Sequence, residues 1–519
     1  MSRARVFAIL LSGCSLMLLN GCAGLPSESD GPQQVVVTVA EAPTVAGRLV
    51  VVYDDAPLTM GSRSVPAAES SLQALHGVQS ARMLGQLHMA VVETADASVE
   101  SRLRAMPHVV AVLHDRLVQL APTSTSTPKA PVPLRYRDVW LPPVLSRFEN
   151  HGIVPSSDDA DSDYNGVSEW AVIAAGGYGL GLGGLSQGPW NRTMGAGVRI
   201  AVLDTGVDPE HPDLAPNLVT SLSEVDPGAM PSACDDATPV DHMGHGSWAA
   251  SLALAAEGRG TGALIGVAPA ASLIDIKVLE RLPGNGSTVQ QQCAAGEASG
   301  LLSWVLAGIN DAIAQHAQVI SLSLGSLVDL STGDGAGWKA AFDHATYAAS
   351  QAGAVVIAAA GNDALDLSTG TLAELPAQSR GVLAVVASTN PACAETDTPT
   401  AACVAGPITR ASYSNHGISG AIAAPGGNDP DSATNSASGG ILGACTQQGS
   451  GCFSDGPQLY TTQIGTSASA PLVAGAAALV IATHPQWGPA QVIAALQQTA
   501  TASSAMQEPE LNTAAAVAQ

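Results

Sequence analysis

Three short segments, far apart in the chain, hold the side chains that hydrolytic chemistry needs. Asp204 ends the apolar run VRIAVLD, His245 lies in DHMGHGSW, and Ser467 lies in GTSASAP. A serine hydroxyl becomes a nucleophile when an imidazole takes its proton, and a carboxylate holds that imidazole in the required tautomer. The three residues therefore predict covalent catalysis at Ser467, with His245 as general base and Asp204 as its orienting partner.

Ser467 also has a purely structural interpretation. It precedes a long apolar run that predicts a helix, and serine side chains often accept hydrogen bonds from the first N–H groups of a helix. Pro471 is compatible with a first helical turn. If Ser467 is the nucleophile instead, the neighbouring Thr466 is the expected cap.

A parallel sheet would bring these distant segments together. Short apolar runs alternate with helical segments, and such continuous apolar strands are expected where helices cover both faces of a parallel sheet. The predicted strands are residues 198–203, 272–279, 318–324, 354–359 and 382–387. Strand ends and the helix starts that follow them share one edge of such a sheet, where ligands bind. The expected fold class is therefore α/β, a doubly wound and mostly parallel sheet with helices on both faces.

Asn362 adds a fourth chemical group. It follows a predicted strand and a glycine in the segment AAAGND. At the same sheet edge, its side-chain amide would donate a hydrogen bond to the oxyanion that develops when a carbonyl is attacked. We therefore predict an oxyanion hole that includes Asn362.

The three segments resemble the signature motifs of the subtilisin-like serine proteases, the subtilases. The family patterns are Asp-Thr-Gly, His-Gly-Thr-His and Gly-Thr-Ser-Met-Ala-x-Pro, and residues 204–206 agree with the first. Ser247 and Trp248 replace the Thr and His of the second pattern, and Ala468 replaces the Met of the third. The resemblance covers a catalytic domain over residues 196–519 and implies a serine endopeptidase that works through an acyl-enzyme. The alternative is an inert, lipid-anchored binding or scaffold protein on the same fold.

The resemblance also implies substrate-binding residues. The segment SLSLGS, which contains Ser323, Leu324 and Gly325, resembles the strand that pairs with the substrate backbone. Glu374, in AELPAQ, falls where the family places the residue at the floor of the primary specificity pocket. A carboxylate there predicts a preference for Lys or Arg before the scissile bond. The alternative is a solvated loop glutamate.

Residues 1–22 are predicted to be an export signal. Arg3 and Arg5 precede a short apolar stretch, and the Leu-Asn-Gly-Cys that ends at Cys22 resembles the lipobox of a bacterial lipoprotein. The resemblance implies cleavage before a lipidated Cys22, with a box ending at Cys14 and a plain secretory signal as alternatives. We expect export from a bacterial cell and a lipid anchor at the envelope, in the outer membrane, or release as a soluble secreted enzyme.

Three more segments precede the catalytic domain. Residues 23–34 are predicted to be a polar tether, residues 35–120 a small α/β module, and residues 121–195 a linker with an N-terminal extension. The module resembles the ferredoxin-like propeptide of subtilases, which implies an intramolecular inhibitor that autoprocessing removes. An unrelated α/β domain is the alternative.

The remaining cysteines are predicted to form disulfides. An even number of them in an exported chain favours pairing, and the absence of a Cys-x-x-Cys pair gives no indication of a metal site. Closeness in sequence suggests the pairs Cys393–Cys403 and Cys445–Cys452, which leaves Cys234–Cys293.

The charge of the chain restricts its partners. Its 519 residues carry a formal net charge of −24, which would repel nucleic acid and anionic membrane surfaces. We therefore expect protein or peptide substrates, and a membrane contact only through the N-terminal lipid. The predicted chemistry needs no cofactor and no metal. The resemblance makes structural calcium an option, but the sequence lacks an Asp-rich loop of the spacing that calcium loops use, and SSDDADSD (156–163) is interpreted as a solvated acidic loop.

Overall fold

The computed structural model describes eight stretches of the chain. They are residues 43–54, 64–120, 170–176, 188–256, 264–390, 408–427, 440–448 and 459–519. The expected export signal with Cys14 and Cys22, the tether, the acidic loop and the cysteines Cys393, Cys403 and Cys452 lie outside the described residues.

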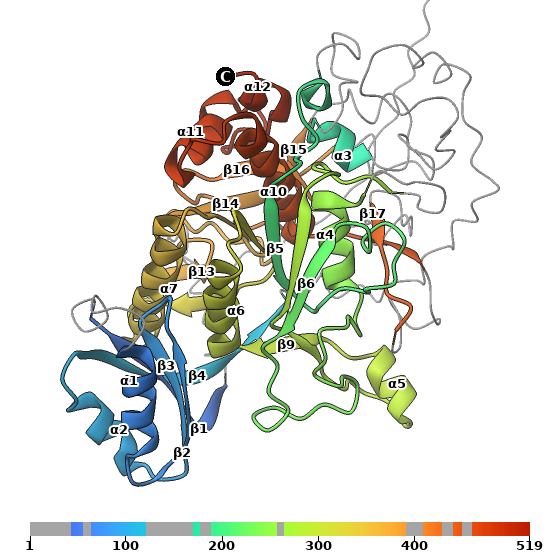
Figure 1. Ribbon diagram of the computed structural model, residues 1–519. Coiled ribbons are helices and arrows are strands. Elements are labelled where there is room, and N and C mark those ends of the chain that lie inside the picture. Colours follow the sequence, from blue (N-terminus) through green and yellow to red (C-terminus); the bar gives the residue numbers. More distant parts are fainter. Residues whose placement is uncertain are drawn as a thin grey trace, which may run out of the picture. The chain divides into compact units, whose positions relative to one another are not determined.

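A mostly parallel sheet forms the centre of the region after residue 196 (Figure 1). Its strand order is β15-β14-β12-β10-β5-β7-β6, and β16 also pairs with β14. The strands are β5 (Arg199–Asp204), β6 (Leu218–Ser223), β7 (Ser272–Lys277), β10 (Val319–Leu322), β12 (Val355–Ala359), β14 (Val382–Thr389), β15 (Thr409–Arg410) and β16 (Ile422–Pro425). All five predicted strands are present. The prediction missed β6, because its sequence LVTSLS is only half buried and lacks a continuous apolar run.

In the five predicted strands, alternate residues face two different layers of helices, which explains why these strands are apolar. Ile200 and Val202 of β5 belong to one core cluster, with the helices α4, α10, α11 and α12. Ala201 and Leu203 belong to a second cluster, with α6 and α7. The helices are α4 (His245–Leu254), α6 (Leu302–Ala314), α7 (Gly333–Gln351), α10 (Thr466–Thr483), α11 (Pro489–Thr499) and α12 (Thr513–Val517). The doubly wound α/β fold is therefore confirmed.

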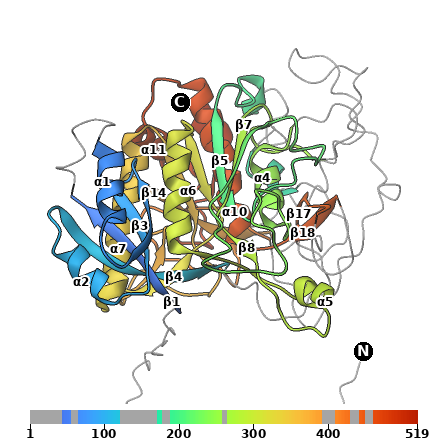
Figure 2. The same cartoon turned by 60° about the horizontal axis from the view of Figure 1, so that its bottom comes forward.

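The helix α10 crosses the centre of the first layer and packs against α4 and the strands (Figure 2). Among the helices of the described residues, α10 is the one that is long and apolar enough to cross a membrane. However, 89% of its most apolar 18-residue stretch is buried inside the protein, as is usual for a core helix. The close packing depends on small residues. A Cβ atom at Gly475 would lie 2.7 Å from the carbonyl oxygen of Ala253 on α4.

The segment before residue 121 has the element order of a ferredoxin-like domain. Its strands are arranged as β2-β3-β1-β4, in antiparallel pairs, around a small core of their own. The elements are β1 (Thr44–Tyr53), α1 (Ser64–Gln73), β2 (Val78–Leu84), β3 (Met89–Thr94), α2 (Ser98–Arg104) and β4 (Val109–Gln119). We call these residues, 43–54 and 64–120, the N-terminal module. Its sheet continues through β4 into β9 (Ala298–Leu301) and β8 (Glu280–Arg281).

Two small two-stranded sheets complete the region around the main sheet. The first pairs β11 (Ser326–Asp329) with β13 (Leu372–Leu375), and the second, a hairpin, pairs β17 (Ile441–Ala444) with β18 (Tyr460–Gln463). The remaining short helices are α3 (Trp170–Ala174), η4 (Pro189–Asn191) and α5 (Val289–Ala294).

The structure contains the predicted disulfide Cys234–Cys293, whose Cα atoms are 5.2 Å apart. Cys445 is also disulfide-bonded. The disulfide Cys234–Cys293 ties α5 to the loop that precedes the histidine helix α4, so it limits the movement of that loop.

Candidate active site

Asp204 is the last residue of β5 and is almost fully buried. Its Oδ1 atom accepts hydrogen bonds from His245 Nδ1 and from the backbone N–H of Thr205, both at 2.7 Å. The bond to Nδ1 fixes the proton on that nitrogen and leaves Nε2 as the basic atom. The structure therefore brings Asp204 and His245 together in the arrangement that the sequence predicts.

His245 is the first residue of α4, and the buried carboxylate of Asp241 holds this helix start in place. Asp241 Oδ1 accepts from the N–H groups of Met243 (2.9 Å) and Gly244 (2.7 Å). Its Oδ2 accepts from the N–H (2.9 Å) and the hydroxyl (2.7 Å) of Ser247. Asp241 thus satisfies N–H groups that have no partner within the helix.

Asp241 also connects the histidine helix to the aspartate strand. The Thr205 hydroxyl donates to Asp241 Oδ1 at 2.9 Å and accepts from the N–H of Gly246 at 2.8 Å. The sequence analysis missed Asp241. Asp241 stands four residues before the helix start, outside the cap position that sequence patterns reveal, so the sequence offered no local signal for its role.

The environment of His245 favours its protonated form. Burial lowers the pKa of the imidazole, but the charge and the hydrogen bond of Asp204, with the charge of Asp241, outweigh burial and raise it above 6.5. A histidine in the role of general base must be deprotonated, so with His245 in that role the expected rate falls as the pH drops through this raised pKa.

Ser467 lies in the first turn of α10, close to the end of β10. Its hydroxyl donates to the carbonyl oxygen of Ser323 at 3.2 Å, and the Ser323 hydroxyl donates to the Ser467 carbonyl at 2.9 Å. No hydrogen bond joins Ser467 to His245 among the described residues, because the serine hydroxyl is turned to Ser323. The N-cap of α10 is Gly465, without a side-chain cap bond. The interpretation of Ser467 as a cap is therefore wrong, and so is the expectation that Thr466 caps the helix.

Thr466 instead fixes the orientation of Asn362. Its N–H and its hydroxyl both donate to Asn362 Oδ1 at 2.9 Å. Because the amide oxygen is used in this way, the Nδ2 group remains as the donor that Asn362 can offer to a ligand.

The space beside Asn362 Nδ2 depends on Gly465. This residue has φ +144°, and a Cβ atom on it would lie 3.2 Å from Asn362 Nδ2 and 3.6 Å from the backbone nitrogen of Ser467. A side chain there would crowd both donors. The glycine therefore leaves room for an oxygen atom between them, as an oxyanion hole requires.

Glu374 is buried on β13, between two backbone segments that lead to the site. A Cβ atom on Gly325 would lie 1.9 Å from Glu374 Oε1, and one on Gly361 would lie 3.1 Å from Oε2. Burial, and secondarily the charge of Asp363, raise the pKa of Glu374 well above its usual value. Glu374 is only 3% exposed, so the interpretation as a solvated loop glutamate is wrong.

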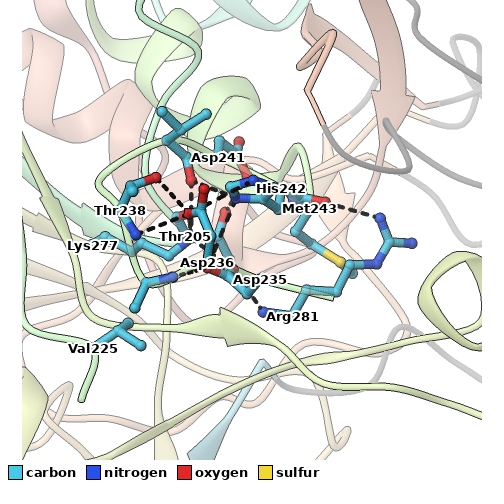
Figure 3. Close-up of polar contacts among 12 residues, drawn as sticks. Thr205, Val225, Asp235, Asp236, Thr238, Asp241, His242, Met243, Lys277 and Arg281 are labelled. Carbon is cyan, nitrogen blue, oxygen red and sulfur yellow. Dashed lines mark hydrogen bonds and ion pairs between the residues drawn. The ribbon is translucent and has the colours of Figure 1, made fainter. Parts of the chain in front are cut away.

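Within the described part of the chain, the side chains close enough to hold a metal ion are Asp235, Asp236 and His242 (Figure 3). Their ligand atoms lie within 4.8 Å of one another. However, the buried ammonium group of Lys277 lies 2.8 Å from Asp235 Oδ2 and also donates to the carbonyl oxygen of Thr205 at 2.8 Å. A cation is therefore already present beside Asp235, and the group does not fit calcium, which needs six or more oxygen ligands.

The bonded pair Asp204 and His245 lies at the edge of a mostly parallel sheet, and Ser467 lies in the first turn of α10, which packs against the histidine helix α4. Residues 195–515 match the Subtilase family, and the chain belongs to this family of serine proteases. Subtilisin E from Bacillus subtilis (strain 168) is 34% identical over 309 residues, which are 59% of this chain and 61% of that protein. Subtilisin from Bacillus pumilus is 33% identical over 307 residues, 59% of this chain and 85% of that protein.

The fold is also similar to that of a solved structure, the epidermin leader peptide processing serine protease from Staphylococcus aureus. The TM-score is 0.57 at 19% identity, over 91% of this chain and 97% of that chain. At this identity the similarity concerns the fold.

The substitution Asp204→Asn should lower the rate of peptide hydrolysis by about 10,000-fold, because the neutral amide favours the wrong tautomer of His245. Asp275→Asn is the matched control. Asp275 is fully buried on the adjacent strand β7, so Asp275→Asn makes the same chemical change at a buried carboxyl that does not bond to His245. Both variants should keep the circular dichroism spectrum of the wild type. An Asp204→Asn rate within tenfold of the control would remove Asp204 from the catalytic machinery.

Proposed function

We propose that this protein is an exported serine endopeptidase that cuts peptide bonds after Lys or Arg. The observation that carries the proposal is the arrangement of groups along one sheet edge. Asp204 is bonded to His245, Asn362 Nδ2 lies beside the backbone nitrogen of Ser467, and the buried carboxyl of Glu374 lies against the strands that lead to them.

In the proposed reaction, Ser467 Oγ attacks the substrate carbonyl carbon while His245 Nε2 takes the hydroxyl proton. The oxyanion accepts hydrogen bonds from Asn362 Nδ2 and from the N–H of Ser467, which has no partner in the first turn of α10. The C–N bond then breaks, and His245 gives its proton to the leaving amine. A water molecule, deprotonated by His245, attacks the acyl-enzyme, and the carboxylic acid product leaves with Ser467 restored.

The proposed specificity rests on Glu374. The residues Ser323, Leu324 and Gly325 follow β10 into β11, whose strand pairs with that of Glu374 through Leu327. A cationic substrate side chain that reaches this buried carboxyl favours its ionised form, and a buried charge pair contributes more than an exposed one. Binding of a Lys or Arg side chain should therefore release a proton from Glu374.

A peptide library should show cleavage after Lys and Arg, and Ser467→Ala should abolish all cleavage. Glu374→Gln should lower kcat/KM for these peptides by about thirtyfold or more, the effect of removing one partner from a buried charge pair. In the wild type, kcat/KM should rise more steeply with pH for Lys and Arg peptides than for otherwise identical Leu peptides. This difference should be absent in Glu374→Gln.

Glu510→Gln is the matched control for Glu374, because Glu510 is a buried glutamate with a raised pKa, about 7, that bonds to Ser388 instead. It should leave the preference unchanged. A preference for Phe or Leu that is the same in wild type and Glu374→Gln would exclude Glu374 from specificity. Absence of all hydrolysis by the matured protein would favour the inert scaffold instead.

We propose that the N-terminal module is the inhibitor of its own chain. Its last strand, β4, pairs antiparallel with β9 through Leu117–Leu301, Val118–Gly300 and Gln119–Ser299. Proteins commonly bind extended peptides by adding them as a strand to a sheet edge. We propose that β9 is such an edge for the substrate backbone, in addition to the segment 323–325, and that the module occupies it.

Charged groups reinforce this docking. Asp115 of β4 is fully buried and accepts from the N–H of Ser303 at 3.0 Å, in the first turn of α6. Arg48 of the module donates to Asp115 at 3.1 Å and to Asp226 of the catalytic region at 2.9 Å. An Asp at a helix N-terminus and a shared arginine both favour the docked arrangement.

Maturation should separate the protease from its anchor. If Cys22 carries the lipid, it lies on the same side of the linker 121–195 as the module, whereas every proposed catalytic residue lies beyond it. Cleavage within 121–195 should leave the lipidated fragment with the envelope and release active enzyme. Mass spectrometry of the active species tests this proposal. Active enzyme that still carries residues 23–120 covalently would contradict it.

A further inference from the structure

Trp248 lies directly beside the general base. It is three residues after His245 on α4, so the two side chains project from the same face of the helix. Their ring centroids are 5.7 Å apart, with an angle of 51° between the ring planes. The indole is fully buried, so it forms a permanent wall for the imidazole on the helix side.

The hairpin β17–β18 fixes the indole from its other side. Trp248 Nε1 donates to the carbonyl oxygen of Ile441 at 2.9 Å. A Cβ atom on Gly443 would lie only 2.3 Å from Trp248 Cδ1, so the ring packs closely against this strand. Ser251 holds the same strand, because its hydroxyl accepts from the N–H of Ala444 at 2.9 Å and donates to the Trp248 carbonyl at 2.8 Å. The indole therefore has one defined position.

Two other fully buried tryptophans of the described chain are held differently. Trp304 and Trp338 are equally buried, but the N–H of each indole has no hydrogen-bond partner within the described residues. Packing alone keeps these two rings in place. At Trp248, packing and a hydrogen bond act together next to a catalytic group.

We propose that Trp248 is a positioning residue for the general base: the hairpin holds the indole, and the indole keeps the His245 ring against Asp204 and stabilises the imidazolium formed during the reaction. A cation within about 6 Å of an aromatic ring is attracted by its π electrons. The inference rests on the proposed function, because it assigns the general base to His245.

Few charged groups compete with this effect. Those that act on His245 are Asp204 at the end of β5 and Asp241 before α4. The helix α10 and the strand β17 contain no ionisable side chain. Loss of the ring should therefore appear in the protonation of His245.

The test compares Trp248→Leu and Trp248→Phe with Trp338→Leu, which removes an equally buried indole far from His245. Trp248→Leu should lower kcat about tenfold or more with little change in KM. The acid limb of the pH profile, which is the fall of kcat/KM at low pH, should shift to lower pH by about half a unit to one unit. This is the size expected from a lost cation–π contact. Trp248→Phe keeps a ring and should show a smaller shift. Trp338→Leu should reduce thermal stability but leave the acid limb in place.

Gly443→Ala provides a second test if Trp248→Leu does not fold. The added Cβ must displace the indole without touching the catalytic residues, and kcat and the acid limb should change in the same direction. The rate of Ser467 labelling by a fluorophosphonate, followed against pH, gives a readout independent of substrate binding.

The inference would be overturned, and the proposed function left intact, by two results together. The wild type labels at Ser467, and every folded Trp248 and Gly443 variant shows the same acid limb as the wild type. Failure of the matured wild type to label or to hydrolyse peptides would overturn the proposed function itself.

Discussion

The buried carboxylate of Asp241 is the interaction on which the site depends. It accepts hydrogen bonds from Thr205 after β5 and from Met243, Gly244 and Ser247 around the start of α4. Removing a carboxylate from water is costly, and several charge-assisted hydrogen bonds are needed to compensate for it. These bonds fix the spacing between the strand that ends in Asp204 and the helix that begins with His245. The 2.7 Å bond between those two side chains is the consequence.

A second buried charge supports the same region from the sheet side. The Lys277 ammonium, on β7, donates to the carbonyl oxygens of Thr205 (2.8 Å) and Val240 (3.0 Å) and pairs with Asp235 (Figure 3). It therefore joins the ends of β5 and β7 to the loop before α4. Removing one partner of such a network leaves an uncompensated buried charge, which is strongly destabilising. The Cys234–Cys293 disulfide closes the other end of this loop, so the histidine is positioned by covalent and electrostatic constraints together.

The sequence was sufficient for features that depend on local patterns or on residue types. The five apolar strands were predicted because each is buried on both faces. The closeness of Asp204 and His245 was predicted because one ends a strand and the other begins a helix at the same sheet edge. The disulfide Cys234–Cys293 was predicted only as the pair left by two closer ones. In contrast, β6 is half buried, and its register with β7 depends on a partner distant in sequence. The same holds for the role of Thr466, because its hydrogen bonds reach Asn362, 104 positions away. The anchoring of Trp248 by Ile441, 193 positions away, has no local signature either.

Consecutive elements of the chain lead from the N-terminal module to the region of Ser467. The strand β9, which pairs with the N-terminal module, leads directly into α6, and β10 leads to the segment that accepts a hydrogen bond from Ser467. β9 belongs to the sheet of the module and β10 to the main sheet, so α6 joins the two sheets.

Asp204 and Asp241 together set the tautomer and basicity of His245. Nitrogen-15 NMR of the Ser467→Ala variant, with labelled histidine and a pH titration, measures both properties without turnover. We expect the neutral imidazole of His245 to carry its proton on Nδ1, and its pKa to lie above the ordinary 6.5. A neutral form with the proton on Nε2, or a pKa below 6.5, would contradict it.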